Sequence, residues 1–233
     1  MSDPTRAALR GISSMATRQV LAELAQAWQQ AGGRPVAIES VGGVEAAKRV
    51  AEGEAFDVVF LASDAIDKLL AAGHALAGSK VDLVRSAVAA AVPAGAPRPG
   101  IATEAALRAA VLAAPSIGYS TGPSGTALLQ LFERWGLAAE LAPRLKQARP
   151  GVPVGSLVAS GEVALGFQQL PELIHVADIQ LLDPLPAAVQ IETVFSGAAC
   201  AGASDPGAVQ ALLAFMASPA AAEAKHRQGM QPA

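Results

Sequence analysis

Residues 53–63 read GEAFDVVFLAS, and this stretch decides the fold class. Gly53 closes a helix predicted over residues 44–52, because glycine commonly ends helices. The following run DVVFL, residues 57–61, is an apolar run led by Asp57, as expected of a strand buried on both faces of a parallel sheet. Another helix is predicted over 63–72. The order helix, buried strand, helix is typical of α/β proteins.

The same alternation precedes this stretch. Strands are predicted at residues 9–12 and 35–40, joined by a helix at 17–31 that ends at Gly32-Gly33. Its apolar side chains recur at helical spacing: Val20, Leu21, Leu24 and Trp28. Strands that alternate with helices form βαβ units and hence a parallel sheet.

A second α/β series follows the apolar run 87–92, which Pro93 stops, and the loop 93–100. The remaining predicted elements are helices at 104–113, 124–135 and 155–160, strands at 116–119, 164–168 and 190–201, and helices at 206–216 and from Pro219. The predicted fold class is therefore α/β, with two lobes that each hold a mostly parallel sheet flanked by helices.

Composition limits the function classes. A chain of 233 residues with 52% hydrophobic and 16% charged residues suits two small globular lobes. The net charge of -3 and the scattered Lys and Arg residues argue against nucleic-acid binding. The single cysteine, Cys200, excludes an intramolecular disulfide and is interpreted as a buried small side chain. His74, His175 and His226 have no ligand spacing, so neither a metal nor a cofactor is predicted.

The first ten residues, MSDPTRAALR, contain no apolar segment of a secretory signal. They predict a cytoplasmic protein, or a periplasmic one if a leader has been removed. The sequence contains no uninterrupted run of about 18 apolar residues, so no membrane span is predicted.

Three turns rich in Ser, Thr and Gly lie between a predicted strand and a helix, at residues 13–17, 40–43 and 120–126. Free N–H groups and the aligned peptide dipoles at helix N-termini favour anions. The carboxyl ends of parallel strands are also where open α/β sheets bind ligands. The alternative is that these Ser and Thr side chains only cap their helices. Three such turns together favour an anion site.

Several polar side chains near these turns are candidate ligands. Arg18 lies at the start of a helix, where a cation opposes the dipole, and a bidentate bond to a ligand carboxylate would explain it. Tyr119 is either a donor to the ligand or a packed side chain. Gln168 and Gln169 end a strand, so only one of the two amides is expected to face the ligand. Lys80 and Arg85 are interpreted as hinge or surface residues.

Three segments, taken in order, resemble the type II periplasmic binding proteins and, among them, the molybdate-binding proteins of ABC transporters. They are GEAFDVVFLAS at 53–63, SIGYSTGPSGTALLQLFERWGL at 116–137 and SGEVALGFQQ at 160–169. The resemblance extends over about residues 9–228. It implies a ligand held between two lobes, with hinge closure over it. Lobe one would be residues 1–86 plus 192–233 and lobe two 87–191, with crossover strands at 85–92 and 192–199.

The ligand residues that the resemblance implies are only partly present. Serines of the family correspond to Ala16 and Gly43, although Ser13 and Ser14 lie just upstream, and a family tyrosine corresponds to Gln169. The backbone donors around Ser124 and Gly125 are retained. A compact oxyanion needs converging hydroxyl and amide donors, so these losses point to a bulkier organic anion. The predicted ligand-binding residues are Ser13, Ser14, Arg18, Gly42, Gly43, Tyr119, Ser120, Thr121, Ser124, Gly125, Thr126, Gln168 and Gln169.

Two functions remain open. The first is a solute-binding protein for a small di- or tricarboxylate, for which the resemblance implies an ABC transporter permease as a partner. The second is an isomerase of an unsaturated tricarboxylate, of the aconitate isomerase kind, with Glu39, Tyr119 or Glu162 as conceivable bases. A family member without a ligand is a third interpretation. No catalytic triad or phosphate loop is visible in the sequence.

Overall fold

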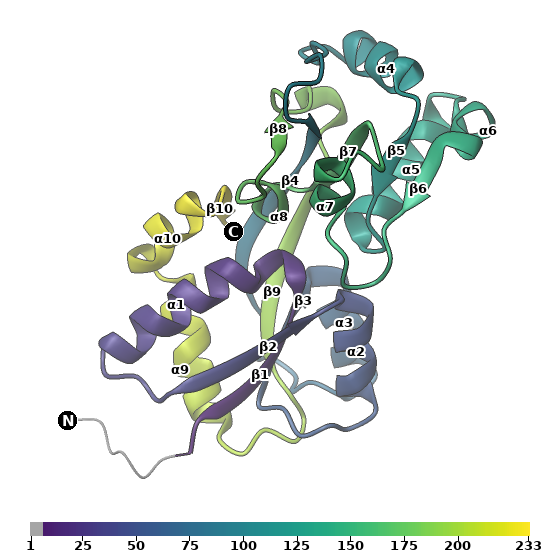
Figure 1. Ribbon diagram of the computed structural model, residues 1–233. Coiled ribbons are helices and arrows are strands. Elements are labelled where there is room, and N and C mark those ends of the chain that lie inside the picture. Colours follow the sequence, from purple (N-terminus) through teal and green to yellow (C-terminus); the bar gives the residue numbers. More distant parts are fainter. Residues whose placement is uncertain (1–6) are drawn as a thin grey trace. The chain divides into compact units, whose positions relative to one another are not determined.

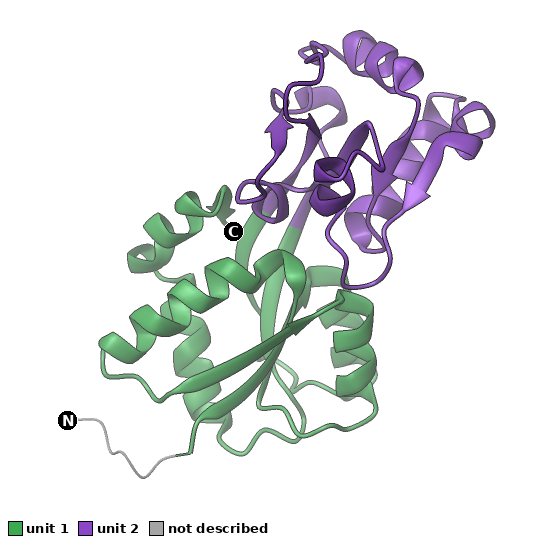
Figure 2. Ribbon diagram, in the orientation of Figure 1, with its two compact units in different colours: residues 1–85, 194–233 green, residues 86–193 purple. Residues whose placement is uncertain are grey.

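The computed structural model describes residues 7–233 and divides them into two compact units (Figures 1 and 2). Unit 1 comprises the chain up to Arg85 and again from Val194 to Ala233, and unit 2 comprises Ser86–Thr193. Residues 1–6, which begin the predicted lobe one and the segment predicted to lack a leader, lie outside the described residues. The chain leaves unit 1 in strand β4 (Val81–Pro93) and returns in β9 (Glu192–Ala199).

Unit 1 is a sheet in the order β2-β1-β3-β9 with helices on both faces. Strand β1 pairs in parallel with β2 and β3, and β9 is antiparallel to β3. Its elements besides the crossover strands are β1 (Leu9–Ser14), η1 (Met15–Thr17), α1 (Arg18–Gln30), β2 (Val36–Val41), α2 (Gly43–Ala51), β3 (Val58–Ala62), α3 (Ser63–Ala71), α9 (Pro206–Ala217), η4 (Pro219–Ala221), α10 (Ala222–Arg227) and β10 (Met230–Pro232).

The apolar residues of the quoted run lie in strand β3, which begins one residue later than predicted, at Val58, and is buried along its whole length. Val58 and Phe60 pack in one core with α1 and α9, while Val59 and Leu61 pack in another with α2 and α3. Figure 1 shows the two pairs of helices on opposite sides of the sheet. Because side chains alternate between the faces of a strand, covering both faces requires an uninterrupted apolar run.

Unit 2 is a sheet in the order β4-β7-β5-β6, in which β5 pairs in parallel with β6 and β7. Strand β4 is antiparallel to β7 and β8. One core lies under α4 and α5, and a smaller one lies under α7 and α8. Its remaining elements are α4 (Glu104–Ala113), β5 (Ile117–Tyr119), α5 (Pro123–Arg134), α6 (Ala138–Leu141), η2 (Ala142–Arg144), β6 (Leu145–Gln147), α7 (Val154–Ala159), β7 (Leu165–Gln169), α8 (Leu170–Leu173), β8 (Ile179–Leu181) and η3 (Ala187–Val189).

The α/β fold class is confirmed. Among the predicted strands, β4 differs from its predicted bounds by several residues. The apolar run predicted a strand at 87–92, whereas the strand begins at Val81. Its first half carries the exposed residues Asp82 and Arg85, so this part of the strand does not read as an apolar run. The strand predicted at 190–201 is also shorter, 192–199. Among residues 7–233, no helix is long and apolar enough to cross a bilayer.

Candidate functional site

In unit 1 the parallel strands β1, β2 and β3 all end at one edge of the sheet, and a helical segment starts directly after each. Ser13 lies opposite Ser40, and their hydroxyl oxygens are 2.8 Å apart. The Thr17 hydroxyl donates to the carbonyl of Ser14 at 3.1 Å and lies 3.4 Å from the Ser14 hydroxyl. The structure therefore gathers the predicted Ser13 and Ser14 and adds Ser40 and Thr17.

The two predicted glycines lie at the same edge. Gly42 is the N-cap of α2, and a Cβ built there would meet nothing within 4 Å. A Cβ at Gly43 would lie 3.5 Å from that of Ser14. Gly43 is therefore adjacent to Ser14, and the absence of a side chain at Gly43 leaves space at that point.

Arg18 begins α1 and is exposed. Its guanidinium has no ion pair or hydrogen bond with any residue in the described part of the chain, whereas Lys80 pairs with Asp67 at 2.6 Å. An unpaired cation next to a helix N-terminus concentrates positive potential at this edge.

In unit 2 the parallel strands β5 and β7 end side by side, with Tyr119 opposite Phe167. The turn after β5 places the hydroxyls of Ser120 and Ser124 3.0 Å apart. Thr121 and Thr126 are exposed, and Tyr119 is half-buried against the core under α5.

Gly125 has a different role from the one predicted. Its amide donates to the carbonyl of Gly122 at 3.0 Å, so it is not a free donor. A Cβ at this position would lie 1.9 Å from the Ser120 carbonyl oxygen, so the turn requires glycine for steric reasons. Since Pro123 has no N–H, the first-turn amide left for an anion is that of Ser124.

The two adjacent glutamines face opposite sides of the sheet, as predicted from strand geometry. Gln168 Oε1 accepts the Val154 amide at 2.7 Å, and its Nε2 donates to Glu172 at 2.6 Å. Gln168 is therefore fully engaged within the protein. Gln169 Nε2 donates to the Thr193 hydroxyl at 2.8 Å, and its Oε1 is buried and has no hydrogen-bond partner in the described part of the chain.

The Ser86 hydroxyl is a second buried polar atom that has no hydrogen-bond partner among residues 7–233. The Val88 amide donates to the Ile191 carbonyl at 2.8 Å, and β4 and β9 run in opposite directions because one leaves unit 1 and the other returns. This pairing places Ser86 beside Thr193 and on the face that carries Gln169, which is opposite Val88. A buried polar group without a partner costs about 1–3 kcal/mol, so these atoms mark a place suited to a polar ligand group or water.

In each unit, helix capping distinguishes the helices that follow the end of a parallel strand from the other helices. Among the described helices of eight or more residues, α4 and α9 are capped by the side chains of Thr103 and Asp205. The helices α1, α2, α3 and α5 have no side-chain cap. All four begin within four residues of the end of a strand. The Ser and Thr residues of these turns therefore do not act as caps, and the turns keep donors for an anion.

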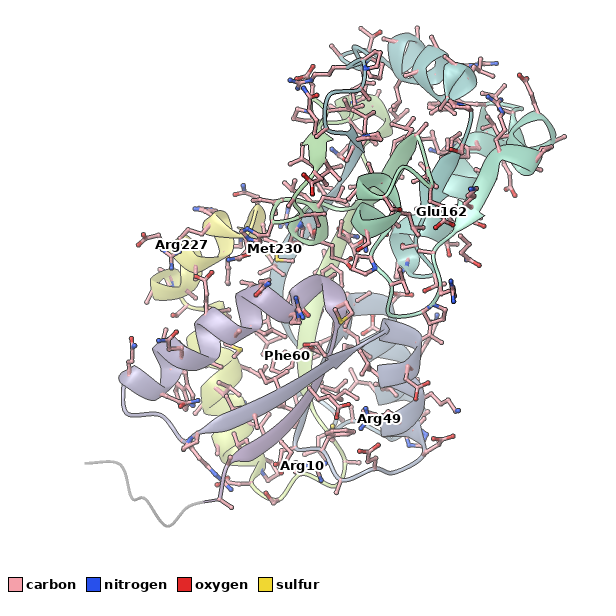
Figure 3. The ribbon with its side chains drawn as sticks, in the orientation of Figure 1. Arg10, Arg49, Phe60, Glu162, Arg227 and Met230 are labelled. Carbon is pink, nitrogen blue, oxygen red and sulfur yellow. The ribbon has the colours of Figure 1, made fainter. Side chains whose placement is uncertain are left out.

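Two of the conceivable bases lie in unsuitable places. Glu39 forms a bidentate ion pair with Arg49, at 2.6 and 3.0 Å, and the hydrogen bonds from this guanidinium lower the pKa of Glu39. Arg49 is labelled in Figure 3 on α2. Glu162, also labelled there, precedes β7 and so lies at its amino end, away from the end that holds Gln169. Sequence reasoning missed Ser86, Thr193 and Glu172, which carry no local motif.

The chain was then compared with known proteins. A model of the bacterial extracellular solute-binding proteins matches residues 9–231. This chain belongs to that family. A curated relative, an aconitate isomerase of Pseudomonas sp., is 37% identical over 227 residues, which is 95% of this chain and 86% of the relative.

Solved structures of other solute-binding proteins share the fold of this family member. The periplasmic molybdate-binding protein of Azotobacter vinelandii aligns with a TM-score of 0.79 at 23% identity, over 95% of this chain and 98% of that one. The sulfate-binding protein of Mycobacterium tuberculosis aligns with a TM-score of 0.79 at 16% identity, over 97% and 87%. The predicted resemblance to type II periplasmic binding proteins is confirmed. Within residues 7–233, no group of His, Cys, Asp and Glu side chains is arranged to hold a metal ion.

Proposed function

We propose that this protein is an isomerase of an unsaturated tricarboxylate of the aconitate type. One observation carries the proposal: the 37% identity to an aconitate isomerase, which extends over 95% of the chain and so includes both strand edges. The fold by itself decides nothing about chemistry, because binding proteins and enzymes share it.

The geometry supports an anionic ligand. The helices that start at the strand ends lack side-chain caps, so their first amides are available to carboxylate oxygens. In unit 1 the unpaired Arg18 and the hydroxyls of Ser13 and Ser14 add a charge and further donors. In unit 2 the amide and the hydroxyl of Ser124 are further hydrogen-bond donors.

The side chains favour an organic acid over a bare tetrahedral oxyanion. Gly43 and Ala16 contribute no hydroxyl, so the donors of unit 1 are spread rather than converging on a compact ion. Gln169 also suits a carboxylate. The Thr193 hydroxyl can donate or accept, so a half-turn of the Gln169 amide presents Nε2 as the free donor in place of Oε1.

A receptor that binds the acid without turning it over is the second candidate, and membership in the solute-binding family favours it. On that interpretation an ABC transporter permease would be the partner. The cytoplasmic location predicted from the first ten residues stays a prediction.

The test combines a thermal-shift screen with proton NMR of the purified chain. The probes are cis- and trans-aconitate, citrate, the saturated analogue tricarballylate, molybdate and sulfate. We expect aconitate to raise the melting temperature by mass action and NMR to show interconversion of its two isomers. A shift with aconitate or citrate but no interconversion would establish the receptor. A shift with molybdate or sulfate alone, or no shift at all, would refute both organic-acid functions.

A further inference from the structure

Three polar side chains of unit 2 lie on three adjacent strands. The strand order β9-β4-β7 places Ser86 of β4 between Thr193 of β9 and Gln169 of β7. Gln169 is paired with Val88, and Ser86 is two residues from Val88, so both side chains project from one face of the sheet. Thr193 lies beside Ser86 on the antiparallel neighbouring strand and projects from the same face.

The hydrogen bond between Gln169 and Thr193 is made across β4. These two residues come from the strands on either side of β4, yet Gln169 Nε2 lies 2.8 Å from the Thr193 hydroxyl. Neighbouring strands are about 4.8 Å apart, so the glutamine side chain extends over β4 to reach Thr193. Ser86 is therefore next to this bond. We call Ser86, Gln169 and Thr193 the polar cluster.

Two atoms of the polar cluster are buried and have no hydrogen-bond partner among residues 7–233. They are Ser86 Oγ and Gln169 Oε1. Ser86 is fully buried and Gln169 is 3% exposed, whereas Thr193 is only partly buried, so the cluster is not sealed on the Thr193 side. Buried polar atoms left unpaired lower the stability of a protein and are rare. The two atoms therefore point to a polar group that comes from outside the chain.

The surroundings of the polar cluster favour a negatively charged group. Val88 and Phe167 on this face share a hydrophobic core with Leu128 of α5, so α5 covers the same face. Helix α5 follows β5, which runs parallel to β7, so the helix begins at the strand end that carries Gln169. It has no side-chain cap, and its free first-turn amide and its dipole favour an anion at that end.

We propose that the polar cluster binds one carboxylate group of the organic acid, with Ser86 and Gln169 as the donors. A carboxylate only accepts hydrogen bonds, so each group that contacts it must donate. The Ser86 hydroxyl rotates to do so, and Gln169 donates through Nε2 after a half-turn of its amide. The Thr193 hydroxyl then donates to Gln169 Oε1 and fixes this orientation, so Thr193 is a positioning residue. This inference rests on the proposed organic-acid ligand, whether the acid is turned over or only bound.

The test measures the binding of tricarballylate, which has no double bond to isomerise, by isothermal titration calorimetry. Ser86→Ala should weaken binding about tenfold or more, because a hydrogen bond to a charged group is lost. Without ligand, the same variant should melt no lower than wild type, because the substitution removes an unpaired buried hydroxyl. Thr193→Val keeps the shape of the side chain but loses the hydroxyl, and it should weaken binding because Gln169 is no longer held.

The control is Ser156→Ala, which changes an exposed serine of α7 on the opposite face of the sheet and should bind tricarballylate as wild type does. An affinity of Ser86→Ala within about twofold of wild type would overturn the inference, leave water as the partner of these atoms and leave the organic-acid function standing. Weaker binding together with a melting temperature several degrees lower would also overturn it, since the hydroxyl would then be structural. If wild type binds neither tricarballylate, citrate nor aconitate, the organic-acid function itself fails, and the carboxylate site fails with it.

Discussion

Replacing Glu172 by glutamine should stabilise the protein at neutral and alkaline pH, independently of any activity. Burial raises the pKa of the folded-state carboxyl from its ordinary value of 4.5 to about 7. Below pH 4.5 the carboxyl is protonated in both the folded and the unfolded chain, so it contributes no pH dependence there. Between these two values the folded chain binds more protons than the unfolded chain, so the stability of wild type falls as pH rises.

The magnitude follows from this displacement of the pKa. At about 1.4 kcal/mol per pH unit, a change from 4.5 to about 7 corresponds to about 3 kcal/mol in the free energy of unfolding. Glutamine does not ionise and can still accept the hydrogen bond from Gln168. The variant should therefore match wild type near pH 4 and exceed its stability by up to about 3 kcal/mol near pH 8.

Urea unfolding followed by circular dichroism, at intervals from about pH 4 to about pH 8, measures this difference. The control is Glu133→Gln, which removes an exposed carboxylate of α5 and should not reproduce this pH-dependent gain in stability. A difference between Glu172→Gln and wild type that is the same at every pH would refute the reasoning. It would mean that Glu172 ionises as it does in the unfolded chain.

Three further predictions concern other sites. Burial would raise the pKa of Asp57, but hydrogen bonds from the Arg10 amide and from Ser204 keep this pKa below its ordinary value. Asp57→Ala should therefore lower the free energy of unfolding by about 2–4 kcal/mol. This loss should become smaller in acid, where Asp57 of the wild type becomes protonated. Gly125→Ala should destabilise by about 1–3 kcal/mol and weaken the aconitate-induced thermal shift, because its Cβ collides with the Ser120 carbonyl oxygen. Arg18→Ala should weaken aconitate binding about tenfold, or about 1.4 kcal/mol, with little change in stability.

Matched variants provide the controls for these three. Asp57→Asn keeps one acceptor oxygen and should cost less than Asp57→Ala in a urea titration. Gly42→Ala adds a Cβ that meets no atom within 4 Å, so its melting temperature should stay close to that of wild type. Arg108→Ala removes an exposed arginine of α4, away from the strand ends, and should leave aconitate affinity unchanged. Equal effects of Arg18→Ala and Arg108→Ala on affinity would remove Arg18 from the site.

The strand-to-helix turns could be found from the sequence because their signals are local. A Ser, Thr or Gly cluster after an apolar run marks a turn at a strand end, and parallel strands share one edge. The predicted Ser13 accordingly lies opposite Ser40, which begins the turn predicted at 40–43. The role of Gly125 was not predictable, because it depends on a carbonyl oxygen five residues earlier that only the folded turn brings near.

The sequence by itself determined the α/β class, the order of the main elements and the family, because hydrophobic periodicity, glycine stops and the spacing of motifs are written along the chain. Only the tertiary structure decided which polar groups are already satisfied. Gln168 and Gln169 are equivalent in sequence, yet the first is held by Val154 and Glu172 and the second keeps a free buried oxygen. The unusual carboxyl of Glu172 likewise depends on burial and on partners distant in sequence, since desolvation is a property of the surrounding packing and not of the residue.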